Sequence, residues 1–282
     1  MQNSVTDTNE QRAATAFTRQ SFVFDDIYAN NTIIHYKRDR VRNHVQQYIQ
    51  PLSSILELNS GTGEDATWFA KQGYTVHATD ISGGMQQMLE KKIETDADVP
   101  GKKITTELCS FTRLETLENK GPYDLIFSNF AGLNCTGQLD QVLLSFSSLL
   151  KANGIVTLVI LSRFCLWETL LLFRGKFKTA LRRFFSRNGA NANVEGEHFK
   201  CWYYNPSYVI KRLAPEFDVL SVEGLCTIVP PSYIENFAEK HPRLYNWLKK
   251  KEDRYKNSWP WKNIGDYYII TLKKTGANEE RW

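Results

Sequence analysis

A short apolar run that breaks into a glycine-punctuated turn constrains the fold of this chain more than any other feature. Residues 55–58 are mostly apolar and lead into Asn59-Ser60-Gly61-Thr62-Gly63, after which a helical pattern begins. Because glycine lacks a Cβ, the backbone of such a turn can approach a ligand closely, and N–H groups at the helix N-terminus can receive polar ligand atoms. The sequence therefore predicts a strand, a tight loop and a helix that together bind a nucleotide-like cofactor.

The next strand-like run ends in an acidic residue. Residues 74–79 precede Asp80, which lies about 20 positions beyond Gly61, the spacing typical of dinucleotide-binding folds. A carboxylate at the end of a second parallel strand can accept two hydrogen bonds from a ribose diol. We therefore predict that Asp80 holds a ribose.

Strand-like and helix-like runs alternate from residue 54 to residue 161, and strand-like runs return at 217–225 and 267–272. This rhythm predicts an α/β fold with a doubly wound, mostly parallel, seven-stranded Rossmann-like sheet whose ligands bind at the carboxyl ends of the strands. We expect residues 1–50 to form a flexible tail, up to about residue 15, and a helical cap. The main domain would then span 51–282, with a helical insertion over 162–205 as a lid over the substrate.

Composition excludes several classes of protein. A hydrophobic content of 42% is enough for a core, and a net charge of +4 over 282 residues does not favour nucleic acid as a partner. The five cysteines show no metal-ligand spacing, the first residues lack the features of a secretory signal, and no apolar run is long enough to cross a bilayer. We expect no bound metal and a cytoplasmic location.

Four motifs between residues 54 and 161 resemble those of the Rossmann-like, class I S-adenosylmethionine-dependent methyltransferases in order and spacing. They are Leu56-Glu57-Leu58-Asn59-Ser60-Gly61-Thr62-Gly63, Asp80-Ile81-Ser82 with Met85, Tyr123-Asp124-Leu125-Ile126-Phe127-Ser128-Asn129, and Leu149-Leu150-Lys151-Ala152-Asn153-Gly154-Ile155-Val156. The resemblance implies an enzyme that binds S-adenosylmethionine, releases S-adenosylhomocysteine and methylates an acceptor.

The resemblance also implies a set of cofactor contacts. The methionine half would lie against Glu57, Asn59, Ser60, Gly61 and Gly63, and beside Asn129 and Phe130. The ribose and adenine would lie against Asp80, Ile81, Met85, Ser110 and Phe111, and the N-terminal residues Tyr28 and Arg38 would cover the cofactor. Two positions depart from the family pattern: Asn59 stands where glycine is common, although asparagine tolerates positive φ, and Ser110 stands where aspartate is common.

The acceptor site has weaker signals. The aromatic residues that could shape it are Phe24, Tyr28, Phe130, Trp202, Tyr203 and Tyr204, and they favour a small aromatic or lipophilic acceptor. His198 and His35 are candidate general bases for an oxygen acceptor, because an unperturbed imidazole pKa suits proton removal at neutral pH.

Residues 163–187 carry seven basic residues and one acid among large apolar side chains. Such a segment can be a lid over the substrate, a helix that contacts a membrane surface or a lipophilic substrate, or a helix packed on the core. We favour the lid.

Two other functions also fit parts of the sequence. Residues 61–66 match the G-x-G-x-x-G/A pattern, so an NAD-dependent oxidoreductase is one alternative. A non-catalytic cofactor-binding module is the other. Glu57 inside the first strand and the run Tyr123-Asp124-Leu125-Ile126 favour the methyl donor over NAD.

Overall fold

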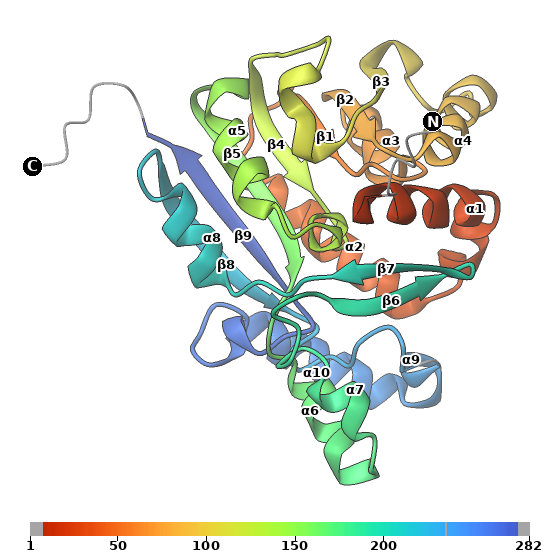
Figure 1. Ribbon diagram of the computed structural model, residues 1–282, viewed down its shortest axis with the longest axis vertical. Helices are drawn as coiled ribbons and strands as arrows, with labels where there is room; N and C mark the ends of the chain where they lie inside the picture. Colours follow the sequence, from red (N-terminus) through yellow and green to blue (C-terminus); the bar gives the residue numbers. More distant parts are fainter. Residues whose placement is uncertain (1–7, 235, 276–282) are drawn as a thin grey trace, which may run out of the picture.

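A seven-stranded sheet forms the centre of the protein in the computed structural model, which describes residues 8–234 and 236–275 (Figure 1). The strand order is β3-β2-β1-β4-β5-β9-β8, and β9 is antiparallel to both of its neighbours. The strands are β1 (Ser54–Leu58), β2 (Thr75–Asp80), β3 (Ile104–Leu108), β4 (Tyr123–Ser128), β5 (Leu150–Leu161), β8 (Phe217–Leu225) and β9 (Tyr267–Lys274). The predicted mostly parallel, seven-stranded sheet is confirmed.

The order of the strands places a crevice at the carboxyl end of β1. The chain winds outward from β1 to β2 and β3, then crosses back to β4 on the other side of β1. Ligands of open parallel sheets bind at such a reversal, because the loops that leave the two central strands diverge there.

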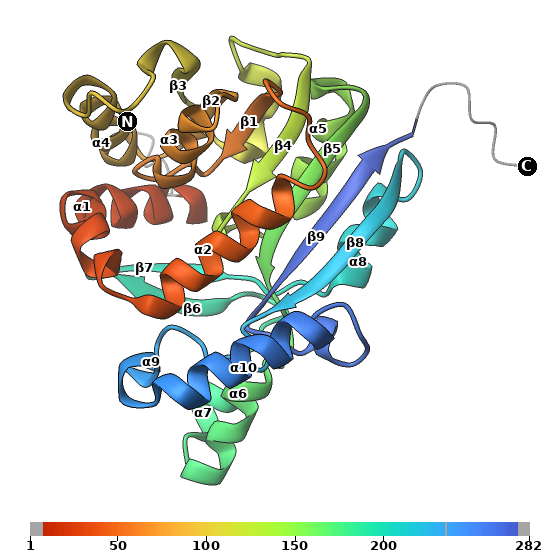
Figure 2. The same ribbon diagram turned by 180° about the vertical axis from the view of Figure 1, so that it is seen from behind.

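Helices cover both faces of the sheet and enclose one apolar core on each side (Figures 1 and 2). On one face the core residues come from α2 (Thr32–Val45), α3 (Glu64–Lys71) and α4 (Gly83–Thr95). On the other face they come from α5 (Leu139–Leu149) and α8 (Pro206–Leu213). Short 3-10 helices fill the connections: η1 (Gly101–Lys103), η2 (Phe111–Thr116), η3 (Gly132–Cys135) and η5 (Trp261–Asn263).

The N-terminal region is more ordered than the sequence suggested. Residues 8–15 were expected to be a flexible tail, and this was wrong: helix α1 runs over Asn9–Ala29. Its first turn is fixed by a capping box, in which the backbone N–H of Gln11 bonds to Thr8 Oγ1 and the Gln11 side chain accepts from the Thr8 N–H. The rest of the predicted tail, residues 1–7, lies outside the described residues.

The insertion after β5 forms two separate pieces. Residues 163–187 fold into three short helical segments, α6 (Leu166–Leu170), η4 (Leu171–Arg174) and α7 (Phe177–Leu181), which project from one end of the molecule (Figures 1 and 2). The hairpin β6 (Ala190–Val194) and β7 (Glu197–Cys201) then packs against α1. The remaining helices, α9 (Phe237–Lys240) and α10 (Pro242–Tyr255), lie beside α6 and α7. No helix in residues 8–234 and 236–275 is long and apolar enough to cross a membrane.

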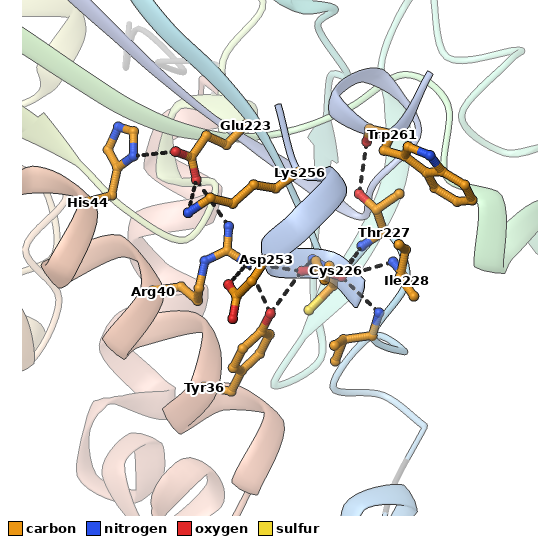
Figure 3. A network of polar contacts seen from close by, with 12 residues as sticks. Tyr36, Arg40, His44, Glu223, Cys226, Thr227, Ile228, Asp253, Lys256 and Trp261 are labelled. Atoms are coloured by element: carbon orange, nitrogen blue, oxygen red, sulfur yellow. Dashed lines mark hydrogen bonds and ion pairs between the residues drawn. The ribbon is translucent and has the colours of Figure 1, made fainter. Parts of the chain in front are cut away.

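A buried polar network fastens α2 to α10 and β8 (Figure 3). The carboxylate of Glu252, in α10, accepts the four consecutive backbone N–H groups of residues 226–229 at 2.8 to 3.0 Å. From α2, Tyr36 Oη donates to the same carboxylate at 3.2 Å and Arg40 approaches it at 3.4 Å. Every lone pair of this fully buried carboxylate therefore has a donor, which fixes α2 against the sheet.

Candidate functional site

A cavity opens at the carboxyl ends of β1, β2 and β4, where the topology predicts it, and contains about 860 Å³ of empty space with its mouth included. Many of the residues that line it belong to the sheet edge and its loops, and others belong to α1, α2 and α3. The lining residues are Glu10, Ala13, Ala14, Phe17, Phe24, Arg38, Glu57, Asn59, Ser60, Gly61, Thr62, Glu64, Asp65, Asp80, Ile81, Met85, Phe111, Asn129, Phe130, Gly132 and Cys135.

The loop between β1 and α3 forms the floor of the cavity and has three left-handed residues, Asn59 (φ 48°), Gly61 (φ 56°) and Gly63 (φ 77°). Asn59 adopts the positive φ expected of it, and its side chain donates to the carbonyl of Asn129 at 2.9 Å. A Cβ at Gly132 would lie 2.2 Å from Asn59 Cγ. Glycine at 132 thus makes room for the asparagine side chain at 59.

Asp80 is buried at the end of β2, with its carboxylate turned toward the glycine loop. Its Oδ2 accepts the Gly61 N–H at 2.9 Å and its Oδ1 accepts the Ser82 N–H at 2.8 Å. Burial raises the pKa of Asp80, and the hydrogen bonds from Ser82 and Gly61 oppose that rise. A carboxylate has about four acceptor sites, so Asp80 can still accept a hydrogen bond from a ligand.

Two acids of the cavity wall have opposite environments. Asp65, at the start of α3, accepts from Arg38 at 3.2 Å, from Arg42 at 2.7 Å and from Asn129 at 2.8 Å. Burial alone would raise the pKa of Asp65, but the two arginines and the Asn129 hydrogen bond lower it. Burial, and then the charge of Asp65, raise the pKa of Glu57 well above its ordinary value. Among the described residues, Glu57 Oε2 is buried and has no hydrogen-bond partner.

The end of β4 brings strained backbone to the cavity. Phe130 and Ala131 both have positive φ, 48° and 66°, which is uncommon for residues with side chains. The Phe130 N–H donates to its neighbour Asn129 Oδ1 at 2.8 Å, and the Ala131 N–H donates to the carbonyl of Val159 at 3.2 Å. The Phe130 ring lies under the Arg38 guanidinium, 4.8 Å from its centre. This turn presents an aromatic ring and an amide side chain to the cavity.

Helix α1 covers the cavity. Tyr28 and Arg38 were expected to cover the cofactor from the N-terminal region, and the 162–205 insertion was expected to be a lid over the substrate. Ala13, Ala14, Phe17 and Phe24 face the cavity from α1, and no described residue of 162–205 lines it. The hairpin of the insertion instead supports α1 from outside, where Phe17 and Phe199 rings lie 5.9 Å apart. The one sequence signal for this helix was the Thr-x-x-Gln capping pattern before an apolar run.

Glu10 fastens the beginning of α1 to the sheet edge. Its carboxylate accepts from Ser110 Oγ at 2.7 Å, from Thr112 Oγ1 at 2.8 Å and from Thr136 Oγ1 at 3.1 Å. These bonds join residues about a hundred positions apart, so no local pattern could reveal them.

Most of the predicted cofactor residues line the cavity, and three do not. Tyr28 packs edge-on against Phe24, 4.9 Å between ring centres, and lies behind it. Gly63 lies under α4, where an added Cβ would be 2.1 Å from Leu89 Cδ1, so its role is packing. Ser110 donates to Glu10 and lines a second groove beside the cavity.

Residues 202–204, three of the aromatic residues predicted to shape the acceptor site, also lie elsewhere. Tyr204 is buried in the core and donates to the carbonyl of Thr136 at 2.7 Å. The Tyr203 ring lies 4.9 Å from the Arg183 guanidinium, and Trp202 lines the second groove. Of the predicted acceptor residues, only Phe24 and Phe130 line the cavity.

Neither candidate base lies at the cavity. His198 is exposed on β7, where its ring hydrogen-bonds to the Asn193 side chain across the hairpin. His35 is exposed on α2, and its Nε2 contacts the carbonyl of Ala29 at 2.7 Å. Both rings are exposed to solvent, and neither is among the residues that line the cavity.

Comparisons with known proteins agree with this geometry. A family model described as a methyltransferase domain matches residues 55–154. No curated protein matches the sequence. Magnesium protoporphyrin IX methyltransferase from Synechocystis PCC 6803, solved with bound S-adenosylmethionine, is 13% identical with a TM-score of 0.58, over 97% of this chain and 100% of that chain.

Two further solved structures share this fold and are named for different reactions. The 1,6-didemethyltoxoflavin-N1-methyltransferase of Burkholderia thailandensis is 13% identical with a TM-score of 0.53, over 98% of this chain and 93% of that chain. The [4+2]-cyclase SpnF is 14% identical with a TM-score of 0.61, over 96% of this chain and 98% of that chain. Likeness at these identities shows the fold, and the same fold hosts different reactions.

The sequence match across residues 55–154 adds evidence beyond the fold, because it covers the glycine loop, Asp80 and the strand β4. Residues 55–154 are therefore similar to a methyltransferase domain, and the chain as a whole has the fold of solved S-adenosylmethionine-dependent methyltransferases.

Proposed function

We propose that this enzyme binds S-adenosylmethionine in the cavity under α1 and transfers its methyl group to a small aromatic or lipophilic acceptor. When bound, the cofactor supplies a methyl group activated by a sulfonium. The residues of the chain would bind and orient the two reactants and exclude water, which can provide much of the catalysis of an in-line displacement.

The observation that carries this proposal is the buried Glu57 carboxyl group, whose Oε2 has no partner among the described residues in a cavity wall. The ammonium group of a methionine moiety would supply the missing donor and a compensating charge. A dinucleotide pyrophosphate would instead place its negative charge beside Glu57 and Asp80, neither of which is ion-paired among the described residues. Electrostatics therefore favours the methyl donor over NAD.

The other end of the cofactor also fits the cavity. Asp80 would accept hydrogen bonds from the ribose diol, as its turned carboxylate allows. Ile81, Met85 and Phe111 line the same region with apolar surface suited to adenine. Asn129 and Arg38 would lie near the methionyl group.

The acceptor side is apolar and aromatic. Phe17 and Phe24 from α1 line the cavity together with Phe130, and such rings can stabilise a cationic methyl donor as well as pack on an aromatic acceptor. No histidine occurs among the residues that line the described cavity. An acceptor that needs no imidazole base, such as an amine, an electron-rich ring carbon or an ionised oxygen, therefore fits best.

Calorimetry with S-adenosylhomocysteine tests the cofactor part of the proposal. We expect Glu57→Gln to bind it at least about tenfold more weakly than the native enzyme, the cost of about 1.4 kcal/mol for one charge-assisted hydrogen bond. Glu94→Gln, an exposed glutamate on α4, is the matched control and should bind as the native enzyme does. Equal affinities for all three proteins would remove Glu57 from the cofactor site.

The acceptor can be sought directly with a cell extract and a donor labelled in its methyl group. We expect the label in a low-molecular-mass product that partitions into organic solvent. Label found only in protein or nucleic acid would contradict a small lipophilic acceptor.

All five cysteines are free thiols, and this supports a reducing, cytoplasmic setting for the reaction.

A further inference from the structure

Residues 163–187, here called the knob, project from the end of the molecule that also carries α9 and α10 (Figures 1 and 2). The knob contains α6, η4 and α7 and contributes no described side chain to the cofactor cavity. Large apolar side chains are exposed on its surface, whereas two charged side chains, Glu168 and Arg183, are buried.

Large apolar side chains of the knob lie on its surface. Phe173 is 88% exposed, Phe185 is 81% exposed and Phe177 is 60% exposed, and Leu170 adds a further exposed aliphatic side chain. Three such phenylalanines within 13 residues have no cover in the described part of the chain. Exposed apolar surface of this kind is typical of a site that contacts a membrane or another protein.

The described charged side chains on the surface of the knob are all basic. Those exposed to solvent are Arg163, Lys176, Lys178, Arg182 and Arg187. The one acid, Glu168, is buried and paired with Arg182 and Arg183. The knob therefore presents phenylalanine rings within a field of positive charge, which is complementary to an anionic and apolar partner.

The base of the knob is held rigidly to the sheet. The buried Arg183 guanidinium bonds to Glu168 at 2.7 Å, to Asp266 at 2.6 Å and to the carbonyl of Ser162 at 3.0 Å. These contacts fill the space among Cys165, Glu168 and Asp266, so this trio of possible metal ligands already has its counter-charge. The exposed rings are thus presented by a fixed support.

The knob lies at the same edge of the sheet as the cofactor cavity. It follows the carboxyl end of β5, whereas the cavity lies at the carboxyl ends of β1, β2 and β4, and these four strands are parallel. A flat surface touching the knob would therefore face the edge of the sheet at which the reaction occurs.

We propose that the knob docks this enzyme on the surface of an anionic phospholipid bilayer. Phe173, Phe177 and Phe185 enter the interface between headgroups and acyl chains, and the surrounding basic side chains contact anionic headgroups. Docking itself is independent of methyl transfer; only the further idea that a lipophilic acceptor arrives from the bilayer rests on the proposed function.

Vesicle co-sedimentation tests the docking. The full chain is mixed with vesicles of phosphatidylcholine alone or of phosphatidylcholine with an equal part of phosphatidylglycerol. We expect at least tenfold stronger binding to the anionic vesicles, with release at high salt. Phe173→Ser/Phe177→Ser/Phe185→Ser and, separately, Lys176→Glu/Lys178→Glu should each weaken that binding at least tenfold.

Phe22→Ser is the matched control, since this phenylalanine is 71% exposed on α1 and lies outside the knob. It should bind vesicles as the native chain does. Docking is overturned if the native chain does not sediment, if the triple serine variant sediments equally well, or if a single-stranded RNA competes the vesicles away because it is the preferred partner. Native binding of S-adenosylhomocysteine by each variant shows that the cavity is intact, so failure of docking and failure of the proposed function are separable.

Discussion

Replacing Glu223 by glutamine should destabilise the protein in a manner that depends on pH. Glu223 lies on β8 and is paired with Arg40, His44 and Lys256, each at 3.1 Å (Figure 3). Burial alone would raise its pKa, but the hydrogen bond from His44 and the charges of Lys256 and Arg40 lower the pKa of Glu223 from 4.5 to about 2. Such a difference between folded and unfolded chains corresponds to about 3 kcal/mol of stability at neutral pH.

The sign of the pH dependence follows from the lowered pKa. The stabilisation is fully present above the ordinary pKa of a glutamate and is lost as the pH falls from 4.5 toward 2. Urea unfolding at pH 7 should therefore give Glu223→Gln a free energy of unfolding about 3 kcal/mol below the native value, and by pH 3 the gap should shrink to less than about half.

Asp253→Asn is the control from the same cluster. Its side chain is 56% exposed and lies 3.6 Å from Arg40, so its loss should cost less than about 1 kcal/mol. Two results would refute this reasoning. One is that Glu223→Gln lowers the free energy of unfolding at pH 7 no more than Asp253→Asn does. The other is that the difference in free energy of unfolding between Glu223→Gln and the native chain grows as the pH falls.

Three further predictions test the site. Gly63→Ala should lower the free energy of unfolding by about 1 to 3 kcal/mol more than Gly61→Ala. Both glycines have positive φ, but only an alanine at 63 would place its Cβ 2.1 Å from a core side chain. Equal midpoints of thermal denaturation for the two variants would contradict the packing argument. His198→Ala and His35→Ala should each change the rate of labelled-methyl transfer by less than about twofold, since both rings are exposed outside the cavity; a large loss for either would restore it as a base. Asp65→Asn should lower the free energy of unfolding in urea at pH 7 by about 3 kcal/mol, because two arginines lose their shared carboxylate. An unchanged free energy of unfolding would show that this pairing is not stabilising.

The central sheet and the loop could be predicted from sequence because their signals are local. Apolar runs of strand length, broken by glycine and followed by helical spacing, fix β1, the loop and α3 within a single stretch of chain. Asparagine tolerates a positive φ, so Asn59 was not expected to disrupt the loop, and its φ of 48° agrees with that. Asp80 lines the cavity because the end of β2 must meet the end of β1 at one edge of a parallel sheet.

The cover of the cavity could not be predicted in the same way. The position of α1 depends on Glu10 reaching Ser110 and on Phe17 packing near Phe199, contacts between residues far apart in sequence. The amphipathic pattern of 163–187 showed that one face is apolar but not whether that face is buried. In the structure Phe173 and Phe185 point to solvent, while Arg183 is buried.

The aromatic run 202–204 shows the same limit. The residue types are known from the sequence, but the path of the chain after β7 determines that Tyr204 enters the core and that Trp202 lines the second groove. His198 lay in a plausible stretch for a base, yet strand alternation turns Phe199 inward and leaves His198 exposed. In each case the tertiary placement of the element determines which side chain reaches the cavity.

The central claim is that the cavity under α1 binds the methyl donor through Asp80 and not a nicotinamide dinucleotide. Titration calorimetry of the native enzyme and of Asp80→Ala with S-adenosylhomocysteine and with NAD tests it most directly. The native enzyme should bind S-adenosylhomocysteine and not NAD, and Asp80→Ala should lose that binding. Binding of NAD alone, or unchanged binding of S-adenosylhomocysteine by Asp80→Ala, would contradict the claim.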